Sequence, residues 1–382
     1  MTKRGALLLI LPVSLIILIT LCLAFILPDK AYSDTEYRSL AQRPDFSSWE
    51  SVPSLFEDYF TDQFPARGQL VRAYTELQLL QNKTYVRDLY VSEDGWLIPR
   101  DYLLSHWDME QAARCVNELA AASPDKALYF LCVPQKSYLF GYKLPYEGMT
   151  HHENLPVFTA ALDSGVRLVN AADAMDAMPP AVKETLFYRT DFHWNARGAF
   201  EAYKLLLDEM IHTGDLPGHA AARPEDYPET VTGQRYLGDL NRRMSYRFDA
   251  EETIQAAYKD ALPVVFSLWQ DGGWQEVPAN SIYNTGADAP ETTYNDAYTD
   301  NLGRYKMTSP LSATGQKLLV IKDSMQNPTS SLFPAVFRET EVIDPRFLTD
   351  ITVKEIAAAS DADLVVIFYN SSNITGDMYN FG

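Results

Sequence analysis

The sequence predicts an α/β protein with a mostly parallel sheet, a β-rich insertion and one N-terminal transmembrane helix. Short, almost wholly apolar segments alternate with amphipathic helical segments on both sides of residues 213–315. Strands this apolar are typical of a parallel sheet that is covered by helices on both faces. In addition, residues 5–27 contain no charged side chain.

The apolar segment 5–27 predicts a membrane anchor. A helix of this length rises about 34 Å, enough to cross a hydrocarbon core of about 30 Å. Lys3 and Arg4 precede it, so the N-terminus is expected in the cytoplasm and residues 29–382 outside the membrane. The run exceeds the apolar region of a cleaved signal peptide. We therefore predict an uncleaved signal-anchor over residues 1–28, with a cleaved signal as the alternative.

Periodicity divides the rest into a lead-in, residues 29–100, and an α/β domain, residues 101–382. The lead-in contains two helical patterns, at 54–64 and 66–81, and a hairpin pattern at 90–100. The α/β domain follows with strand and helix patterns in alternation. Its predicted strands are 127–134, 167–170, 317–322, 341–344 and 363–369, and its predicted helices are 109–123, 156–165, 195–210, 326–338 and 353–360.

Residues 213–315 interrupt this alternation and predict a mostly β insertion. They are rich in Gly, Pro, Asn, Asp, Thr and Tyr, and residues 264–277 have the pattern of a hairpin around Asp271-Gly272-Gly273.

Charge and motif content exclude several classes of function. The net charge of −19 argues against nucleic acid and against an anionic membrane surface as partners. The chain contains no CxxC or HExxH motif or comparable metal-ligand spacing. We predict neither a metal nor a cofactor.

Ser324 is a candidate nucleophile because it follows the apolar segment KLLVIK directly after Asp323. In parallel sheets reactive residues lie at the carboxyl ends of strands, and a serine there can present its hydroxyl at the sheet edge. The alternative is a plain helix N-cap, which is the commonest role of serine after a strand.

Asp191 and His193 form a second candidate group. In an extended segment residues i and i+2 point to the same side, so Asp191 could fix the tautomer of His193 and leave the other ring nitrogen as a base. The same spacing could hold a metal ion, or it could be a hydrogen-bonded histidine at a helix start. Together with Ser324 the pair supplies the three roles of acyl transfer.

Several stretches resemble the DHHW family of Gram-positive bacteria, which is related to AlgJ/AlgX-type proteins of alginate O-acetylation with SGNH-hydrolase-like domains. They occur in order along nearly the whole chain: DTEYRSLAQRP (34–44), FEDYFTDQFPARGQLV (56–71), DGWLI (94–98), VPQKSYLF (133–140), TDFHWNARGAFEAY (190–203), LLVIKDSMQNP (318–328), VIDPRF (342–347) and DLVVIFYN (363–370). The resemblance implies an SGNH-hydrolase-like fold with three layers, α/β/α.

The resemblance also implies catalytic roles. It makes Ser324 the nucleophile, His193 the base and Asp191 its partner. Two departures stand out. Phe192 stands where the D-H-H-W motif that names the family has its first histidine. We expect its side chain to face away from Asp191 and His193. Lys322 stands where SGNH enzymes have the glycine of Gly-Asp-Ser.

Four further residues are candidates for binding substrate or the oxyanion. Asn370 ends the last predicted strand and could donate its amide to an oxyanion, or could simply cap a turn. Lys136 and Arg346 follow predicted strand ends, where a cation could hold an acyl or sugar oxygen or join a structural ion pair. Trp194 could stack on a sugar or belong to the core.

We therefore expect a membrane-anchored, extracytoplasmic O-acyltransferase, and more specifically an O-acetyltransferase of a cell-surface polysaccharide. The resemblance implies a multi-span membrane O-acyltransferase as the acyl-donor partner. A carbohydrate esterase or deacetylase with the same triad is one alternative, since water and a sugar hydroxyl compete for an acyl-enzyme. A non-catalytic glycan-binding scaffold is the other.

Overall fold

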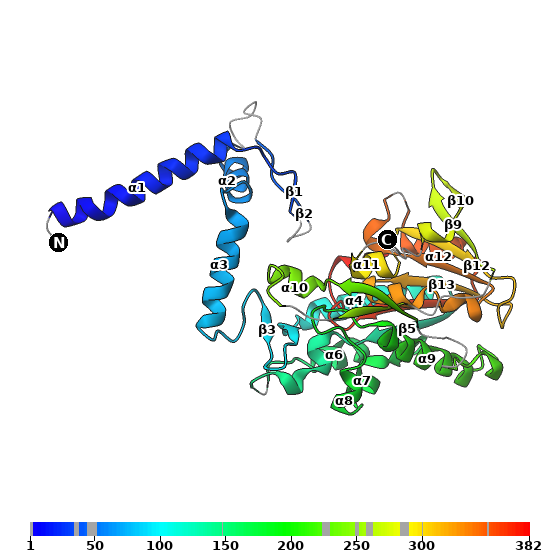
Figure 1. Ribbon diagram of the computed structural model, residues 1–382. Coiled ribbons are helices and arrows are strands. Elements are labelled where there is room, and N and C mark those ends of the chain that lie inside the picture. Colours follow the sequence, from blue (N-terminus) through cyan, green and yellow to red (C-terminus); the bar gives the residue numbers. More distant parts are fainter. Residues whose placement is uncertain are drawn as a thin grey trace. The chain divides into compact units, whose positions relative to one another are not determined.

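The computed structural model describes residues 3–33, 38–43, 52–146, 148–223, 230–248, 252–256, 263–282, 290–299, 301–349 and 351–382. Its contacts divide the chain into two compact units. Unit 1 comprises residues 1–87 and 241–247, and unit 2 comprises residues 88–240 and 248–382. Figure 1 shows the helices and strands of both units.

Unit 1 consists mainly of helices. They are α1 (Lys3–Ile26), α2 (Val52–Asp62) and α3 (Arg67–Leu80), with a small antiparallel pair, β1 (Tyr32–Ser33) and β2 (Arg38–Ser39). The two helices predicted at 54–64 and 66–81 are confirmed as α2 and α3. They are separated at Pro65 and Ala66, and Ala66 has a φ of 59°. The motif at 34–44 lies only partly within the described residues.

Among the described residues, no helix combines the length and the hydropathy that a membrane span requires. The anchor at residues 5–27 stays a prediction.

An eight-stranded sheet in the order β10-β9-β12-β14-β13-β15-β5-β6 forms the centre of unit 2. The five strands from β14 to β6 are parallel to one another. They coincide with the five predicted strands, so the mostly parallel sheet is confirmed. Their bounds are β5 (Ala127–Val133), β6 (Val166–Asn170), β13 (Lys317–Lys322), β14 (Glu339–Ile343) and β15 (Leu364–Asn370).

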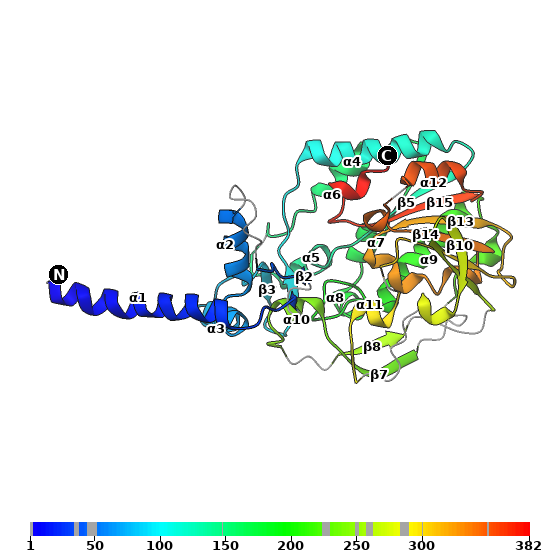
Figure 2. The same ribbon diagram turned by 90° about the horizontal axis from the view of Figure 1, so that it is seen from above.

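Helices cover both faces of this sheet (Figure 2). On one face the ring of Phe130 packs 4.9 Å from Phe158 of α6. On the other face Phe368 packs 6.1 Å from Trp194, just before α9, and the alternation along a strand explains the two directions. The described helices of unit 2 that precede the insertion are α4 (His106–Ala122), α5 (Lys136–Leu139), α6 (Asn154–Ala160), α7 (Ala171–Asp176), α8 (Pro180–Lys183) and α9 (Ala196–His212). After the insertion comes α12 (Val353–Ala359).

The insertion contributes strands to two sheets. β9 (Val265–Gln270), β10 (Gly273–Val277) and β12 (Arg304–Thr308) extend the main sheet as antiparallel strands. β7 (Thr230–Tyr236), β8 (Thr253–Ala256) and β11 (Glu291–Thr292) form a separate sheet. The predicted hairpin at 264–277 is confirmed as β9 and β10. The remaining helices of this segment are α10 (Asp239–Arg243) and α11 (Tyr294–Ala297).

The predicted hairpin at 90–100 is confirmed as β3 (Leu89–Val91) and β4 (Leu97–Pro99). It turns at Gly95, whose φ of 84° favours glycine. Single 3₁₀ turns complete the unit: η1 (Gly141–Lys143), η2 (Gly218–Ala220), η4 (Ala279–Ser281), η7 (Pro345–Phe347) and η8 (Asp377–Tyr379).

The helix predicted over residues 326–338 is wrong. This segment forms two 3₁₀ turns, η5 (Ser324–Thr329) and η6 (Phe333–Ala335). Pro328 lies inside the first and Pro334 inside the second, and each lacks the N–H that a continuous α-helix requires.

Candidate active site

Ser324, His193 and Asp191 lie in hydrogen-bonding distance in one continuous chain. The Oγ atom of Ser324 is 2.9 Å from Nε2 of His193, and Nδ1 of His193 is 2.7 Å from Oδ1 of Asp191. An ionised carboxylate only accepts, so Nδ1 carries the proton and Nε2 is left as the acceptor for the Ser324 hydroxyl. Asp191 and His193 are buried, whereas Ser324 is partly exposed.

The Asp191 segment is a bend and not the extended stretch that the sequence suggested. The Oδ1 atom of Asp191 accepts a hydrogen bond from the backbone N–H of His193, at 2.9 Å, as well as from its ring. This side chain-to-backbone bond over two residues is an Asx turn. The turn bends the backbone so that the side chains of Asp191 and His193 meet.

The second oxygen of Asp191 is held by the insertion. The hydroxyl of Tyr236 donates to Oδ2 at 2.7 Å, and the backbone N–H of Asp239 donates at 2.6 Å. Burial acts to raise the pKa of Asp191, but the neighbouring His193 and these hydrogen bonds outweigh it and hold the pKa below its usual range. The carboxylate therefore stays charged, as a partner for an imidazolium must.

Two aromatic rings enclose the imidazole of His193. Tyr294 of α11 stacks on it with ring centroids 3.7 Å apart and an interplanar angle of 6°. Phe192 lies on it as well, with centroids 3.8 Å apart. The expectation that Phe192 faces away from the pair is wrong, because the bend turns its ring onto His193.

Asp323 fixes the turn that carries Ser324. Its carboxylate accepts from the N–H of Met325 at 2.8 Å, the N–H of Asn370 at 2.7 Å and the amide of Asn373 at 2.9 Å. Burial raises the pKa of Asp323 and these hydrogen bonds oppose the rise. The ends of β13 and β15 are thereby tied together beside the serine.

Asn370 is locked in one orientation. Its Oδ1 accepts hydrogen bonds from the N–H and the hydroxyl of Ser372, at 2.8 and 2.9 Å. With the oxygen held in this way, the two N–H groups of the amide are directed away from Ser372. This arrangement suits a donor to an oxyanion.

Lys136 does not offer its charge to a substrate. Its ammonium is buried and donates to the carbonyl oxygens of Tyr188, Arg189 and Asp191, at 2.8, 2.8 and 2.7 Å. Burial lowers the pKa of Lys136 to about 7. Three carbonyls need three N–H donors, which only the protonated amine supplies. Lys136 thus holds the bend that carries Asp191, and the expected contact with an acyl or sugar oxygen is not available to it.

Trp194 also has a structural position. It is fully buried, and its Nε1 donates to the carbonyl of Met325 at 2.7 Å. It therefore joins the histidine segment to the serine turn from beneath, and no face is open to a sugar.

Arg346 stands near the same edge and keeps a partly exposed side chain. It pairs with Asp344 through two hydrogen bonds, Nε to Oδ1 at 2.9 Å and a terminal nitrogen to Oδ2 at 2.6 Å. Asp344 also faces the buried ammonium of Lys322, at 3.5 Å. Contact of Arg346 with a substrate stays a prediction.

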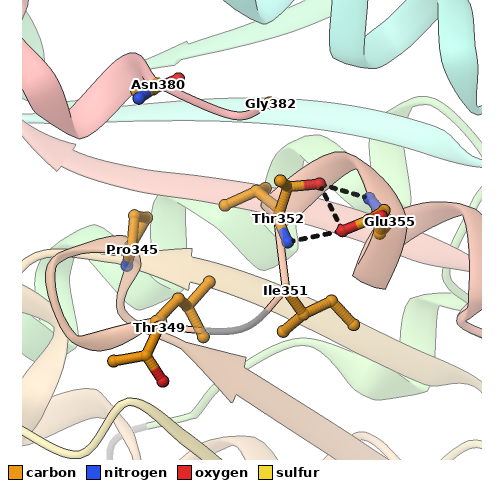
Figure 3. Close-up of a pocket in the computed structure, with 9 residues that line it drawn as sticks. Pro345, Thr349, Ile351, Thr352, Glu355, Asn380 and Gly382 are labelled. Carbon is orange, nitrogen blue, oxygen red and sulfur yellow. Dashed lines mark hydrogen bonds between the residues drawn. The ribbon is translucent and has the colours of Figure 1, made fainter.

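The described part of unit 2 contains clefts beside this edge of the sheet. One has a volume of about 430 Å³ and is drawn in Figure 3, with the capped start of α12, Thr352 and Glu355, in its wall. The described residues that line it do not include the triad. Across the described residues, no group of three or more His, Cys, Asp or Glu side chains is suited to a metal ion.

Sequence reasoning missed three contributors to the site. They are Tyr236, the backbone of Asp239, and Tyr294. All lie in the insertion, which has no periodicity that connects it to the sheet edges. A tyrosine-rich composition was its only signal.

Comparisons with known proteins agree with this architecture. Residues 89–263 match the family model described as SGNH hydrolase-like domain, acetyltransferase AlgX. Among curated proteins none matches the chain.

Solved structures share the fold. Bacillus cereus PatB1 is 22 % identical, with a TM-score of 0.69 over 77 % of this chain and 99 % of PatB1. A second PatB1 structure, with a sulfonyl adduct, gives 22 % identity and 0.68 over 76 % and 97 %. A DHHW family protein from Eubacterium siraeum is 17 % identical, with 0.62 over 78 % and 95 %. The resemblance predicted from the motifs is confirmed: residues 89–263 match the AlgX model of SGNH hydrolase-like domains, and the structures that share the fold include a DHHW family protein.

Proposed function

We propose that this protein is a membrane-anchored, extracytoplasmic serine O-acyltransferase, an O-acetyltransferase that modifies a cell-surface polysaccharide through an acyl-Ser324 intermediate. One observation carries the proposal: the hydrogen-bonded series Ser324 Oγ, His193 Nε2, His193 Nδ1 and Asp191 Oδ1, at 2.9 and 2.7 Å. These distances are those of a serine nucleophile, its base and the carboxylate that orients the base.

In the first half-reaction the Ser324 hydroxyl gives its proton to Nε2 of His193 as Oγ attacks the acyl carbonyl carbon of the donor. The imidazolium is stabilised by the charged Asp191. The tetrahedral oxyanion then collapses, the bond to the leaving group breaks, and His193 returns the proton to that group. The acyl group remains on Ser324 as an ester.

In the second half-reaction His193 removes the proton of a sugar hydroxyl, whose oxygen attacks the acyl-Ser324 carbonyl. Collapse breaks the bond to Oγ, and Ser324 regains its proton from His193. The Asn370 amide is our assignment for an oxyanion donor in both halves, because its orientation is fixed by Ser372.

The anchor and the donor partner belong to the same proposal. The uncharged segment 5–27 would tether the acyltransferase unit at the outer surface, where a multi-span membrane O-acyltransferase would deliver acyl groups. PatB1, which shares the fold, is known with a sulfonyl adduct, and this makes a sulfonyl fluoride a reasonable probe for Ser324.

Hydrolysis of carbohydrate esters is the second candidate. The partial exposure of Ser324 favours it as a competitor, because water can reach an acyl group there. Transfer and hydrolysis share the acyl-enzyme and differ only in which hydroxyl His193 deprotonates.

The test supplies residues 29–382 with 4-nitrophenyl acetate, with and without a cell-wall glycan preparation, and follows acetate and acetylated sugar. We expect acetylated sugar from the wild type and neither product, above background, from Ser324→Ala. Ser331→Ala is the matched control, because it removes a partly buried hydroxyl that bonds to the Pro328 carbonyl and to no member of the triad. Acetate alone would favour the esterase. Neither product above background from the wild type would favour the scaffold, and equal activity of Ser324→Ala would contradict the role of Ser324.

A further inference from the structure

A second cleft of unit 2, of about 440 Å³, is built from aromatic and polar side chains of the insertion and of the turn after β14. Trp269 and Phe347 supply its aromatic surface, and Gln270, Asp271 and Arg304 supply polar groups. Its volume lies in the range of small-molecule sites, about 300 to about 1,000 Å³. No described residue of the triad lines it.

The aromatic wall is rigid. Trp269 is paired across the hairpin with Trp274, and their rings lie 5.3 Å apart at an angle of 77°. The guanidinium of Arg304 lies 4.3 Å from the ring centre of Trp269 and 5.1 Å from that of Trp274. Such contacts hold the rings in place, and a preformed aromatic wall loses little side-chain entropy when it binds a ligand.

The hairpin turn adds to this rigidity. Asp271 and Gly272 have φ angles of 51° and 77°, as a two-residue turn of type I′ requires. The turn fixes one end of the β9–β10 hairpin, and the pairing of β9 with β12 fixes its side.

The cationic side chains of this region are already neutralised within the protein. Arg304 donates to Glu341 at 2.7 Å, and Lys306 lies 3.6 Å from Glu339. An anionic ligand would have to displace these partners. Aromatic rings beside hydroxyl-binding amide, carboxylate and guanidinium groups suit a neutral sugar, whose C–H face is apolar and whose rim is polar.

The cleft lies along the same edge of the sheet as Ser324. Ile321 of β13 is in register with Ile343 of β14, and Ile343 is in register with Arg304 of β12. Trp269 follows Leu268, which pairs with Tyr305. Three strand spacings of about 4.8 Å put β9 about 14 Å from β13, a distance that a short oligosaccharide spans.

From this geometry we infer that the cleft between Trp269 and Phe347 is a subsite for a neutral sugar unit of the acceptor polysaccharide, several residues along the glycan from the unit that is acetylated. The inference rests on the proposed function for the identity of the glycan as acceptor. It assigns a specificity role to the insertion and leaves the chemistry at Ser324 unchanged.

The test measures binding of two neutral probes, the tetrasaccharides of glucose and of N-acetylglucosamine, to the full-length protein in detergent micelles by isothermal titration calorimetry. We compare the wild type with Trp269→Ala and with Phe347→Ala, whose side chain is half exposed and whose loss leaves the core intact. Trp107→Ala is the matched control, since Trp107 is exposed on α4, away from the cleft. Near-ultraviolet circular dichroism reports whether each variant is folded.

We expect at least one tetrasaccharide to bind the wild type and Trp107→Ala equally, and to bind both cleft variants at least tenfold more weakly. Acylation of Ser324 by 4-nitrophenyl acetate should be unchanged in Phe347→Ala. Failure of both tetrasaccharides to bind at 10 mM (about the weakest useful subsite affinity), or binding unaffected by both cleft variants, would overturn the subsite. Ser324→Ala should bind like the wild type, so loss of the proposed chemistry alone would leave this result standing.

Discussion

The hydroxyl of Ser324 lies 2.9 Å from the imidazole of His193, although 131 positions separate the two residues in the chain. β13 delivers the serine to the edge of the sheet, while the bend before α9 delivers the histidine. Two hydrogen bonds hold these segments in place. Nε1 of Trp194 donates to the Met325 carbonyl, and the carboxylate of Asp323 accepts from the backbone N–H of Asn370 at the end of β15.

Replacing Tyr236 with phenylalanine should slow catalysis without unfolding the protein. The change removes one of two donors to Oδ2 of Asp191, and a hydrogen bond to a charged group contributes about 1.5 to about 3 kcal/mol. We expect kcat for ester hydrolysis to fall by about 10-fold to about 100-fold at unchanged KM. Tyr298→Phe is the control, because Tyr298 pairs with Tyr188 in the same cluster. An equal loss in both variants would argue for a packing effect.

Acid should remove a stabilising contribution of Asp191. Its pKa is lowered in the folded protein, so this contribution is fully present above the unfolded pKa of about 3.9 and is lost as pH falls through the lower folded pKa. The difference in unfolding free energy between wild type and Asp191→Asn should therefore shrink from about pH 5 to about pH 2. Urea titrations at several pH values measure it. A difference that grows on acidification would contradict the assignment.

Lys136→Met should destabilise unit 2. Methionine fills the space but leaves the carbonyls of Tyr188, Arg189 and Asp191 without their donor. Each buried unsatisfied group costs about 1 to about 3 kcal/mol, so we expect a loss of at least about 3 kcal/mol in chemical denaturation. Lys354→Met, at an exposed pair with Glu118, should change stability by less than about 0.5 kcal/mol. A stable Lys136→Met protein with full activity would show that the bend does not need the ammonium.

Asn370→Ala should lower kcat for ester hydrolysis by about 10²-fold to about 10³-fold, as expected for loss of one oxyanion donor. KM should change little, because the oxyanion develops only after binding. The backbone bond of Asn370 to Asp323 is kept in this variant, so the turn at Ser324 stays in place. Asn373→Ala provides the contrast, since it removes a hydrogen bond to the same Asp323 without removing the proposed donor. Equal kcat for Asn370→Ala and wild type would exclude the amide.

The sequence was sufficient to predict the parallel strands and, through the family resemblance, to select Ser324, His193 and Asp191, but the contact between Ser324 and His193 comes from the structure. Apolar runs mark buried strands directly, and Ser324 follows one of them. It was not sufficient for Lys136, whose position after β5 was predicted correctly but whose partners depend on how the bend at 188–191 folds over it.

The contribution of the insertion to the site could not be predicted from the sequence either. Tyr236 and Tyr294 bring ring and hydroxyl to Asp191 and His193 through tertiary contacts with no local pattern. The helix predicted over residues 326–338 left out the effect of Pro328 and Pro334, which lie inside the two 3₁₀ turns. A proline in the interior of a helix removes a backbone hydrogen bond, so two prolines six residues apart prevent a continuous α-helix in this segment.

Intact mass spectrometry tests most directly whether Ser324 accepts the acyl group. Residues 29–382 are mixed with an activated acetyl ester, and the reaction is quenched in acid within seconds. The intact mass of the protein is then measured, and peptide mapping locates any adduct. We expect a mass increase of one acetyl group on Ser324 in the wild type and no such increase in Ser324→Ala. An unmodified Ser324 in the wild type, while acetyl transfer or hydrolysis proceeds, would contradict it.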